Sequence, residues 1–293
     1  MKAAVLELRS VLRVAGVDAR PFLQGLISND ITKVSPTRAI HASLLTAQGR
    51  YLHDFFVVAH DDALLLDVER ARRDDLRKRL SLYRLRSKVT VEPVDDLAVM
   101  AFWPETALAR LGLPPEAGVA ADRAGGVVLV DPRLAALGAR ALVPPARLDE
   151  ALDGFERALL ADYDRHRLAL GVPDGSRDLV AEKSLLLENG FDELNGVDWQ
   201  KGCYVGQELT ARTKYRGLVK KRLLPVAIDG APPEPGTPVM LGAREAGEMR
   251  SSADGVGLAL LRLEMVDAAA LEGEPLTAGT ARLTPQRRDW MKF

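Results

Sequence analysis

The sequence predicts an α+β protein of two or three domains that ends in a small β-barrel. Over the first two thirds of the chain, short apolar runs typical of strands alternate with helical stretches. After Arg222 the density of proline and glycine rises, and several short strand-like runs follow. The 293 residues suffice for about two domains of roughly 150 residues, or for three small ones.

The first elements are expected to be a helix and a hairpin. Asp18 is suited to cap a helix, and Pro21 is tolerated in its first turn. The runs AIHASLLTA and YLHDFFVVAH are expected to pair through a turn at residues 48–50, where Gly49 supplies a positive φ. A strand, a helix and a short strand should follow at residues 64–68, 69–85 and 88–92.

The middle of the chain is expected to hold small strands and helices. Residues 93–150 alternate short apolar runs with helical stretches and carry no chemical motif. One amphipathic helix is predicted from Leu148 to Arg167. A second is predicted to begin in GQELTART, which starts at Gly206.

The bulk composition describes an ordinary soluble protein: 47% of the residues are hydrophobic and 28% are charged. The net charge of −1 argues against a general nucleic-acid coat protein. Two stretches are nevertheless basic: residues 70–88 sum to +7 and residues 201–222 to +6. Each is either a solvated face or a binding surface for an anionic ligand or partner.

The single cysteine and the apolar pattern predict a location. One cysteine cannot form an intramolecular disulfide, and its use fits a reducing compartment. The sequence contains no apolar run of 18 residues and no signal-peptide segment at its amino terminus. We therefore expect a cytoplasmic protein with no membrane partner.

Motifs of several enzyme classes are missing from the sequence. It contains no GxxxxGK[ST] phosphate loop, no GxGxxG that opens a helix, no HExxH and no GxSxG. The four histidines are His41, His53, His60 and His166. Because strand side chains alternate between faces, they do not converge as a zinc site requires, so we expect no metal site made by the protein alone.

Two carboxylates are candidates for ligand binding. Asp54 lies in a strand whose two faces are both apolar, so it is expected to be buried and either ion-paired or turned toward a ligand. Glu188 ends the apolar run Leu185–Leu187 and precedes Asn189-Gly190, which places it at the mouth of a buried element. It could accept hydrogen bonds from an amino-pyrimidine edge or be an ordinary surface glutamate.

The strongest candidate is Cys203, in the run Lys201-Gly202-Cys203-Tyr204-Val205-Gly206-Gln207-Glu208. A cysteine of this kind is either a buried small hydrophobe or a functional thiol. Polar, glycine-rich flanks, a lysine two residues before it and a following helix favour a reactive thiolate.

This run resembles the KGC-aromatic-x-GQE signature of the YgfZ/GcvT-like folate-binding family. The likeness continues through Leu209–Thr213 and Lys220–Arg222, and weaker matches extend over nearly the whole chain except residues 93–165. Within that family the chain is most similar to the branch of Iba-type, mitochondrial-type iron–sulfur assembly factors.

The resemblance implies a three-domain aminomethyltransferase-like fold around a central folate channel, with a C-terminal β-barrel. The expected domains are residues 1–45 with 150–216 (folate-binding), 46–149 (ferredoxin-like) and 217–293 (barrel). The implied cofactor is tetrahydrofolate, held by Asn29, Asp30, Asp54, Glu188 and Arg212.

The resemblance also implies a function: an accessory factor for maturation of [4Fe–4S] proteins, working with A-type iron–sulfur carriers and client proteins. Cys203 and Lys201 would be its reactive residues. Cys203 would be a transient ligand of a cluster shared with a partner, or a redox-reactive thiol.

One departure from the family bears on catalysis. Aminomethyltransferases carry an Asp-Asp pair after a Gly-Gly turn, where this chain has His53-Asp54 after Gly49-Arg50. We therefore expect an assembly factor rather than an enzyme. The alternatives are a folate-dependent aminomethyl transferase and a redox or tRNA-modification accessory protein.

Overall fold

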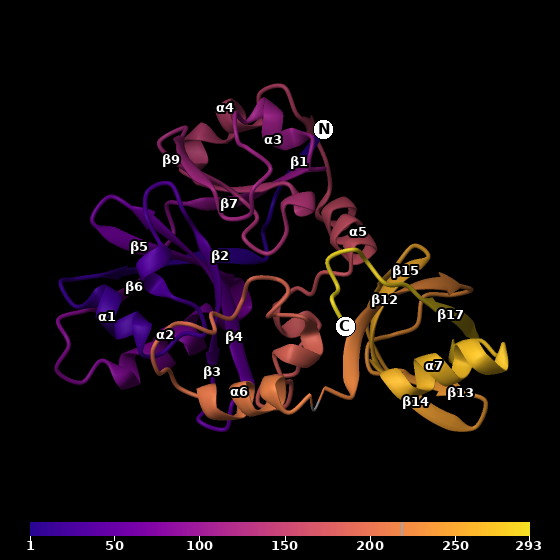
Figure 1. Cartoon of the computed structure of the whole chain (residues 1–293). Helices are drawn as coiled ribbons and strands as arrows, with labels where there is room; N and C mark the ends of the chain where they lie inside the picture. The colour runs from indigo at the N-terminus through magenta and orange to yellow at the C-terminus, as the bar shows by residue number, and fades with distance from the viewer. Residues whose placement is uncertain (218) are drawn as a thin grey trace. The chain divides into compact units, whose positions relative to one another are not determined.

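The computed structural model describes residues 1–217 and 219–293 and divides into two compact units. Unit 1 comprises residues 1–45, 52–163 and 194–205, and unit 2 comprises residues 46–51, 164–193 and 206–293 (Figure 1). The chain is a mixture of strands and short helices, which confirms the predicted α+β class. The division into three domains stays a prediction, because one compact unit can hold more than one domain.

A five-stranded sheet in unit 1 carries the first predicted elements. Its order is β3-β4-β5-β2-β6, with bounds Ile40–Leu45, Tyr51–His60, Ala63–Glu69, Arg9–Ala15 and Thr90–Val94. The hairpin is confirmed: β3 and β4 are neighbours, and Gly49 has a φ of 70° in the turn between them. The predicted strand at residues 64–68 lies within β5.

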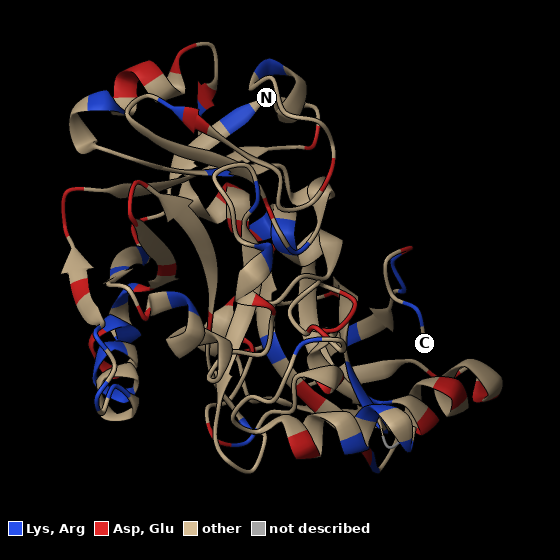
Figure 2. Ribbon diagram, turned by 60° about the vertical axis from the view of Figure 1, so that its left-hand side comes forward, with Lys and Arg blue, Asp and Glu red and all other residues tan. Residues whose placement is uncertain are grey.

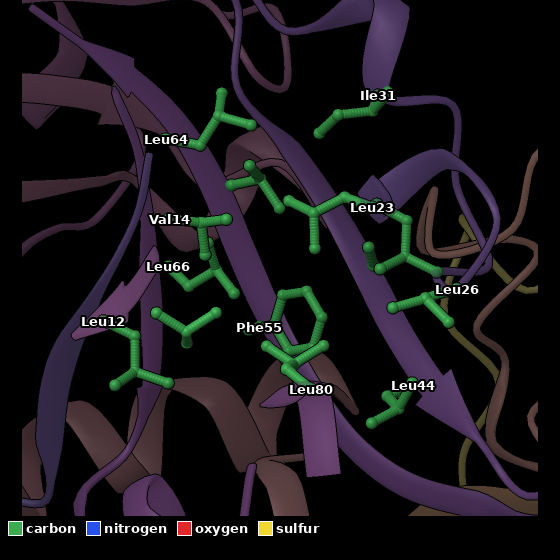
Figure 3. Close-up of a cluster of buried hydrophobic side chains, with 14 of the residues drawn as sticks. Leu12, Val14, Leu23, Leu26, Ile31, Leu44, Phe55, Leu64, Leu66 and Leu80 are labelled. Carbon is green, nitrogen blue, oxygen red and sulfur yellow. The ribbon is translucent and has the colours of Figure 1, made fainter. Parts of the chain in front are cut away.

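Helices α1 (Ala19–Gln24) and α2 (Arg73–Tyr83) pack by their apolar residues in one core with this sheet. Figure 3 shows Leu23 and Leu80 pointing into the same cluster as Phe55. Asp18 stands at the N-cap position, as predicted, but its side chain does not cap the helix. Its carboxylate instead accepts the backbone N–H of Lys88 at 2.8 Å.

A second sheet of unit 1 has six strands. Its order is β11-β1-β7-β10-β9-β8, with bounds Glu156–Arg157, Lys2–Val5, Ala98–Trp103, Ala139–Val143, Gly126–Val130 and Ala120–Arg123. Helices α3 (Ala107–Arg110) and α4 (Leu148–Leu152) contribute to the core on one face.

The two sheets of unit 1 share an apolar core. One buried cluster joins Val11 and Leu65 of the first sheet to Val99 and Leu129 of the second. Alternate residues of β2, such as Leu12, point instead into the cluster with α1 and α2. Both faces of the first sheet are therefore buried, which explains why its strands are apolar on both sides.

The prediction of a single helix from Leu148 to Arg167 is wrong. The structure has α4, then β11, then α5 (Leu160–Leu170). Gly154, with a φ of 74°, follows α4, and β11 pairs in parallel with β1. The pairing with a strand about 150 residues away in sequence overrides the local helical pattern.

Unit 2 contains the predicted β-barrel, which is closed by β12-β15-β14-β13-β16-β17. The strand bounds in chain order are Lys221–Asp229, Pro238–Leu241, Arg244–Ala253, Val256–Arg262, Leu276–Ala278 and Ala281–Pro285. The strand-like runs LLPVAI, TPVML, VGLALLRL and TARLTP of the sequence correspond to β12, β13, β15 and β17, and β14 and β16 were missed. The run REAGEMRSSA of β14 is largely polar, so it carries a weak strand signal.

Helices α7 (Leu263–Glu272) and α6 (Gln207–Tyr215) also belong to unit 2, and α6 begins where the sequence predicted. Leu168 of α5 packs on Leu223 and Leu258 of the barrel. The remaining short helices are 3₁₀ turns: Ile31–Lys33, Arg70–Arg72, Ala135–Leu137, Pro145–Arg147, Gly175–Arg177 and Leu187–Asn189. Within the described part of the chain, no helix is long and apolar enough to span a membrane.

Candidate functional site

The segment that carries Cys203 is fixed to unit 1 by Lys201. The Lys201 ammonium is buried and donates to the carbonyl oxygens of Gln24 at 2.8 Å, Ile27 at 2.5 Å and Asn29 at 2.9 Å. An ammonium has three hydrogens, so these carbonyls use all of them. Burial lowers the pKa of Lys201 to about 8, against the opposing attraction of Asp30 and Asp198.

Asp198 holds the start of the same segment. One carboxylate oxygen accepts the backbone N–H groups of Gln200 at 2.7 Å and Lys201 at 3.0 Å, and the other pairs with Lys33. Burial alone would raise the pKa of Asp198, but Lys33 and the two N–H groups outweigh it and hold the pKa below its usual range. The loop before Cys203 is thus ordered by side-chain bonds rather than by regular secondary structure.

Cys203 itself is exposed, between anchored neighbours. Tyr204 is buried, and the Lys201 ammonium lies 4.9 Å from the centre of its ring. The Val205 N–H donates to the carbonyl oxygen of Gly25 at 3.1 Å, and its side chain packs on the core of the first sheet. The structure therefore presents a solvent-exposed thiol on an ordered backbone, so Cys203 is not a buried, packed cysteine.

Asn29 and Asp30 are tied into the fold of unit 1. The Asn29 amide donates to the carbonyl oxygens of His41 at 2.7 Å and Asn195 at 2.8 Å. The Asp30 carboxylate accepts from the Gln24 amide at 3.0 Å and caps the turn that follows it. Both side chains hold together the loop on which Lys201 is fastened, so their binding of a cofactor stays a prediction.

Asp54 is buried, as predicted, and lies next to His41. Its carboxylate is 3.4 Å from Nε2 of His41, whose Nδ1 lies 3.2 Å from the carbonyl oxygen of Leu194. The His41 ring meets the Phe56 ring edge-on, with the centroids 5.5 Å apart. His53, next to Asp54 in sequence, lies in contact with Asp75 instead.

Sequence reasoning did not select His41. It lies with Asn29 and Asn195 on the wall of a cavity of about 260 Å³ in unit 1, which Lys33 and Arg38 also line. His41 sits in an apolar run without a motif, so the only sequence signal was a polar residue at a buried strand position. The four histidines supply no metal cluster: in residues 1–217 and 219–293, no group of three potential ligands converges.

A buried network of charges lies beside Phe56. Asp67 accepts from Arg9 at 2.7 Å and from Arg140 at 2.8 Å, and Asp131 accepts from Arg133 at 2.8 Å. The guanidinium groups of Arg140 and Arg133 lie 4.5 Å and 5.1 Å from the centre of the Phe56 ring. The Asp67–Arg140 pair joins β5 of the first sheet to β10 of the second, and Phe56 of β4, the strand that carries Asp54, packs against the same guanidinium.

Glu188 lies in unit 2, in the 3₁₀ turn Leu187–Asn189, and is half-buried. Burial raises the pKa of its carboxyl, and four cations oppose the shift. These cations are Lys221, Arg50, Arg222 and Arg250. Its side chain forms no hydrogen bond or ion pair with the described residues. A half-buried carboxylate of this kind is suited to accept from a ligand.

Arg222 and Arg212 are two further basic residues of unit 2. Arg222 donates to the carbonyl oxygen of Leu187 at 2.9 Å and to the carboxylate of Glu193 at 2.9 Å, so it holds the turn that bears Glu188. Arg212 is exposed on α6. The predicted site residues therefore fall into two groups: Asn29, Asp30, Asp54, Lys201 and Cys203 in unit 1, and Glu188 and Arg212 in unit 2.

Comparison with known proteins identifies the family. The human mitochondrial iron–sulfur cluster assembly factor IBA57 is 39% identical to this chain in an alignment that covers 89% of this chain and 77% of the human protein. The chain belongs to the IBA57 family. The mouse IBA57 protein is 37% identical with the same coverage, and the homologue from Pyricularia oryzae is 31% identical over 93% of this chain and 75% of its own.

Two further comparisons agree with the fold. Residues 220–293 match the family model of the CAF17 C-terminal β-barrel domain, which corresponds to the closed barrel of unit 2. The glycine cleavage system aminomethyltransferase T from Bartonella henselae superposes with a TM-score of 0.78, covering 98% of this chain and 85% of its own, at 15% identity. Membership of the IBA57 family with this fold confirms the predicted aminomethyltransferase-like architecture; at that identity the likeness concerns the fold alone.

Proposed function

We propose that this protein assists the maturation of iron–sulfur proteins, and in particular of [4Fe–4S] proteins. The observation that carries the proposal is the 39% identity, over 89% of the chain, to a human protein named as an iron–sulfur cluster assembly factor. The exposed thiol of Cys203 supports it from the structure.

Cys203 is the residue proposed to contact the cluster. Cysteine thiolates are the usual ligands of iron–sulfur clusters, and a cluster takes several of them. Cys203 supplies one, so the remaining ligands of a transiently held cluster would come from a partner. An ordered loop suits this role, because a ligand fixed in place loses little conformational freedom when it binds.

An A-type carrier and the client proteins are the proposed partners. In this scheme the cluster is cargo rather than a resident cofactor, and Lys201 serves by fixing the backbone just before the thiol. Its three bonds to backbone carbonyls support that positioning role.

We further propose that tetrahydrofolate binds this protein. Glu188 fits such a ligand: the amino-pyrimidine edge of the pteridine donates hydrogen bonds, and Glu188 offers a half-buried carboxylate with a raised pKa. Arg212, in the same unit as Glu188, would attract the carboxylates of the folate tail. When bound, tetrahydrofolate would supply the one-carbon and redox chemistry of its pteridine ring.

The experiment that tests the function mixes the purified protein with a cluster-loaded A-type carrier and an apo [4Fe–4S] enzyme. Visible absorption and the recovered enzyme activity are followed for the wild type and for Cys203→Ser. We expect the variant to lose at least about tenfold in the rate of activation, since a serine hydroxyl is a poor cluster ligand. Its thermal stability should not change, because exposed substitutions alter stability by about 0.5 kcal/mol or less.

Equal activation by the wild type and Cys203→Ser would remove the thiol from the function. A parallel assay with an aminomethyl donor and tetrahydrofolate separates the transferase alternative. Turnover at about 1 per second or faster there would be typical of an enzyme and would contradict the assembly-factor proposal.

A further inference from the structure

The end of α2 and the chain that follows it carry exposed apolar side chains with no internal role. Leu76 and Leu80 bury the inner face of this helix in the core of unit 1. Leu82 is two residues further on, about 200° around the helix from Leu80, and is 69% exposed. Leu85 is 90% exposed and Tyr83 is 43% exposed.

Cations surround these apolar side chains. Six Lys and Arg residues and no Asp or Glu lie between residues 76 and 91. Arg77 and Arg79 face Asp74 and Asp75 of the same helix. The other four cations are exposed and form no ion pair within the described part of the chain: Lys78, Arg84, Arg86 and Lys88. Figure 2 shows the Lys and Arg residues of the chain in blue.

The segment is ordered, although its side chains point to solvent. The N–H groups of Arg84 and Ser87 donate to the carbonyl oxygens of Ser81 at 3.2 Å and Arg84 at 2.8 Å. The Lys88 N–H is held by Asp18, and the next residue, Val89, is buried in the core. Both ends of residues 81–88 are therefore anchored.

Leu85 is held in an unfavourable backbone conformation. Its φ is 43°, in the left-handed region, where a residue with a Cβ costs about 1–2 kcal/mol. Its side chain gains no burial in return, since it is 90% exposed. Strained residues of this kind are enriched where a segment contacts a ligand or partner.

We propose that residues 77–88, the basic–apolar patch, dock a protein partner whose contacting face carries carboxylates around a small apolar depression. Arg84 and Arg86 would pair with the carboxylates, and Leu82 and Leu85 would enter the depression. Arginine and tyrosine are enriched at the residues that dominate protein interfaces, and guanidinium groups pair bidentately with carboxylates. The proposal concerns residues other than Cys203 and does not depend on the role of the thiol.

Other classes of partner fit the patch less well. A helix that binds a lipid surface lays its whole apolar face into the interface, but the apolar face of α2 is occupied by the core of unit 1. Nucleic-acid binding is dominated by phosphate contacts, which would leave the exposed leucines of the patch without a partner.

The test places a photo-crosslinking amino acid at residue 85 of the full chain in living cells. Leu271 is the matched control position: it is 88% exposed on α7 and has the acidic neighbours Glu272 and Glu274. We expect a covalent adduct with a discrete protein from position 85 and none from position 271. Arg84→Glu with Arg86→Glu should reduce the adduct by about tenfold, because reversing interface charges weakens encounter and binding.

The identity of the crosslinked molecule shows which class of partner binds the basic–apolar patch. Peptide mapping should place the crosslink beside an acidic segment, and changing its carboxylates to lysines should restore the adduct with the charge-reversed chain. An adduct with lipid, nucleic acid or a second copy of this chain would overturn the proposal. So would the absence of an adduct, an equal yield from position 271, or a yield that charge reversal leaves unchanged. Circular dichroism of the charge-reversed chain checks that it remains folded.

Discussion

Single side chains in this protein have structural roles that their positions in the sequence do not reveal. Lys201 is two residues from Cys203, which suggested a role in activating the thiol. Its ammonium instead bonds to carbonyl oxygens of Gln24, Ile27 and Asn29. Those partners lie more than 170 residues away in sequence, so no local pattern could have identified them. The exposure of Cys203 and the burial of Asp54, in contrast, followed from their neighbours.

Glu188 should be tested by folate affinity. Glu188→Gln keeps the shape of the side chain but makes one of its two acceptor atoms a donor, which would face the amino group of a pteridine. We expect the binding free energy of tetrahydrofolate to weaken by about 1–3 kcal/mol, the usual effect of leaving a donor unpaired. Calorimetry measures it, with Glu182→Gln, an exposed glutamate of the same segment, as the control. Equal affinity of the wild type and Glu188→Gln would place the pteridine elsewhere.

His53 should make the free energy of unfolding depend on pH. Burial lowers the pKa of His53 to about 4, helped by the charge of Arg72 and opposed by Asp75. The unfolded chain takes up this proton near pH 6.5 and the folded chain only near pH 4, so the unfolded state binds more protons between these values. The free energy of unfolding should therefore fall by about 3 kcal/mol as the pH drops from 6.5 to 4.

Urea unfolding at several pH values measures this slope, the change of the free energy of unfolding with pH. His53→Gln should flatten it, whereas His60→Gln, at a more exposed position, should leave it unchanged. The same slope in wild type and His53→Gln would assign the pH dependence to other groups.

Helices and strands of this chain were predictable where apolar residues recur with a regular period. They were not predictable where pairing with a strand distant in sequence decides the structure. The hairpin of β3 and β4, the start of α6 and the barrel all follow from apolar spacing and turn residues. Strand β11 was missed because its partner, β1, lies at the other end of unit 1 in sequence. Strand β14 was missed because its pattern is largely polar. Within the candidate site, the sequence did not reveal His41 or the anchoring role of Lys201, because the contacts of both side chains come from other elements.

Two glycines near the candidate site should differ in their tolerance of a side chain. A Cβ at Gly49, whose φ is 70°, would lie 2.8 Å from the carbonyl oxygen of Gly206 and 2.9 Å from the Cβ of Leu209. Gly49→Ala should therefore destabilise the protein by about 2–4 kcal/mol, from backbone strain and crowding together.

Gly202 is the matched control. A Cβ there meets no atom within 4 Å, and the residue is exposed. We expect Gly202→Ala to change the stability by about 0.5 kcal/mol or less. Thermal unfolding of both variants checks the pair, and similar melting temperatures would show that the turn at Gly49 can relax.

At the scale of the whole molecule, the two compact units are interleaved along the chain. Each consists of three segments that alternate with those of the other, so the polypeptide passes between them at five junctions. The sequence predicted a discontinuous first domain and a continuous barrel. Within unit 2, residues 164–193 depend on the barrel: Leu168 packs on Leu223, and the Trp290 indole donates to the carbonyl oxygen of Leu170 at 2.8 Å.

A chain that ends at residue 219 should show whether unit 1 stays folded when the barrel of unit 2 is absent. It retains every segment of unit 1 but lacks the barrel. Hydrogen exchange should show loss of protection in residues 164–193, because their packing partners are removed, while strand β7 of unit 1 stays protected. Protection of residues 164–193 equal to that in the full chain would show that this part of unit 2 folds without the barrel.

The interleaving also sets the order in which the ribosome can complete each unit. Unit 1 has its two sheets once residue 163 has emerged, but it lacks residues 194–205, and with them Lys201 and Cys203. Until that segment arrives, the carbonyl groups of Gln24, Ile27 and Asn29 lack the ammonium that joins them in the finished protein. Since domains fold as they emerge during synthesis, the thiol leaves the ribosome only after most of its scaffold is in place. A nascent chain therefore spends little time with its single thiol on an unfolded segment, where oxidation would be hardest to prevent.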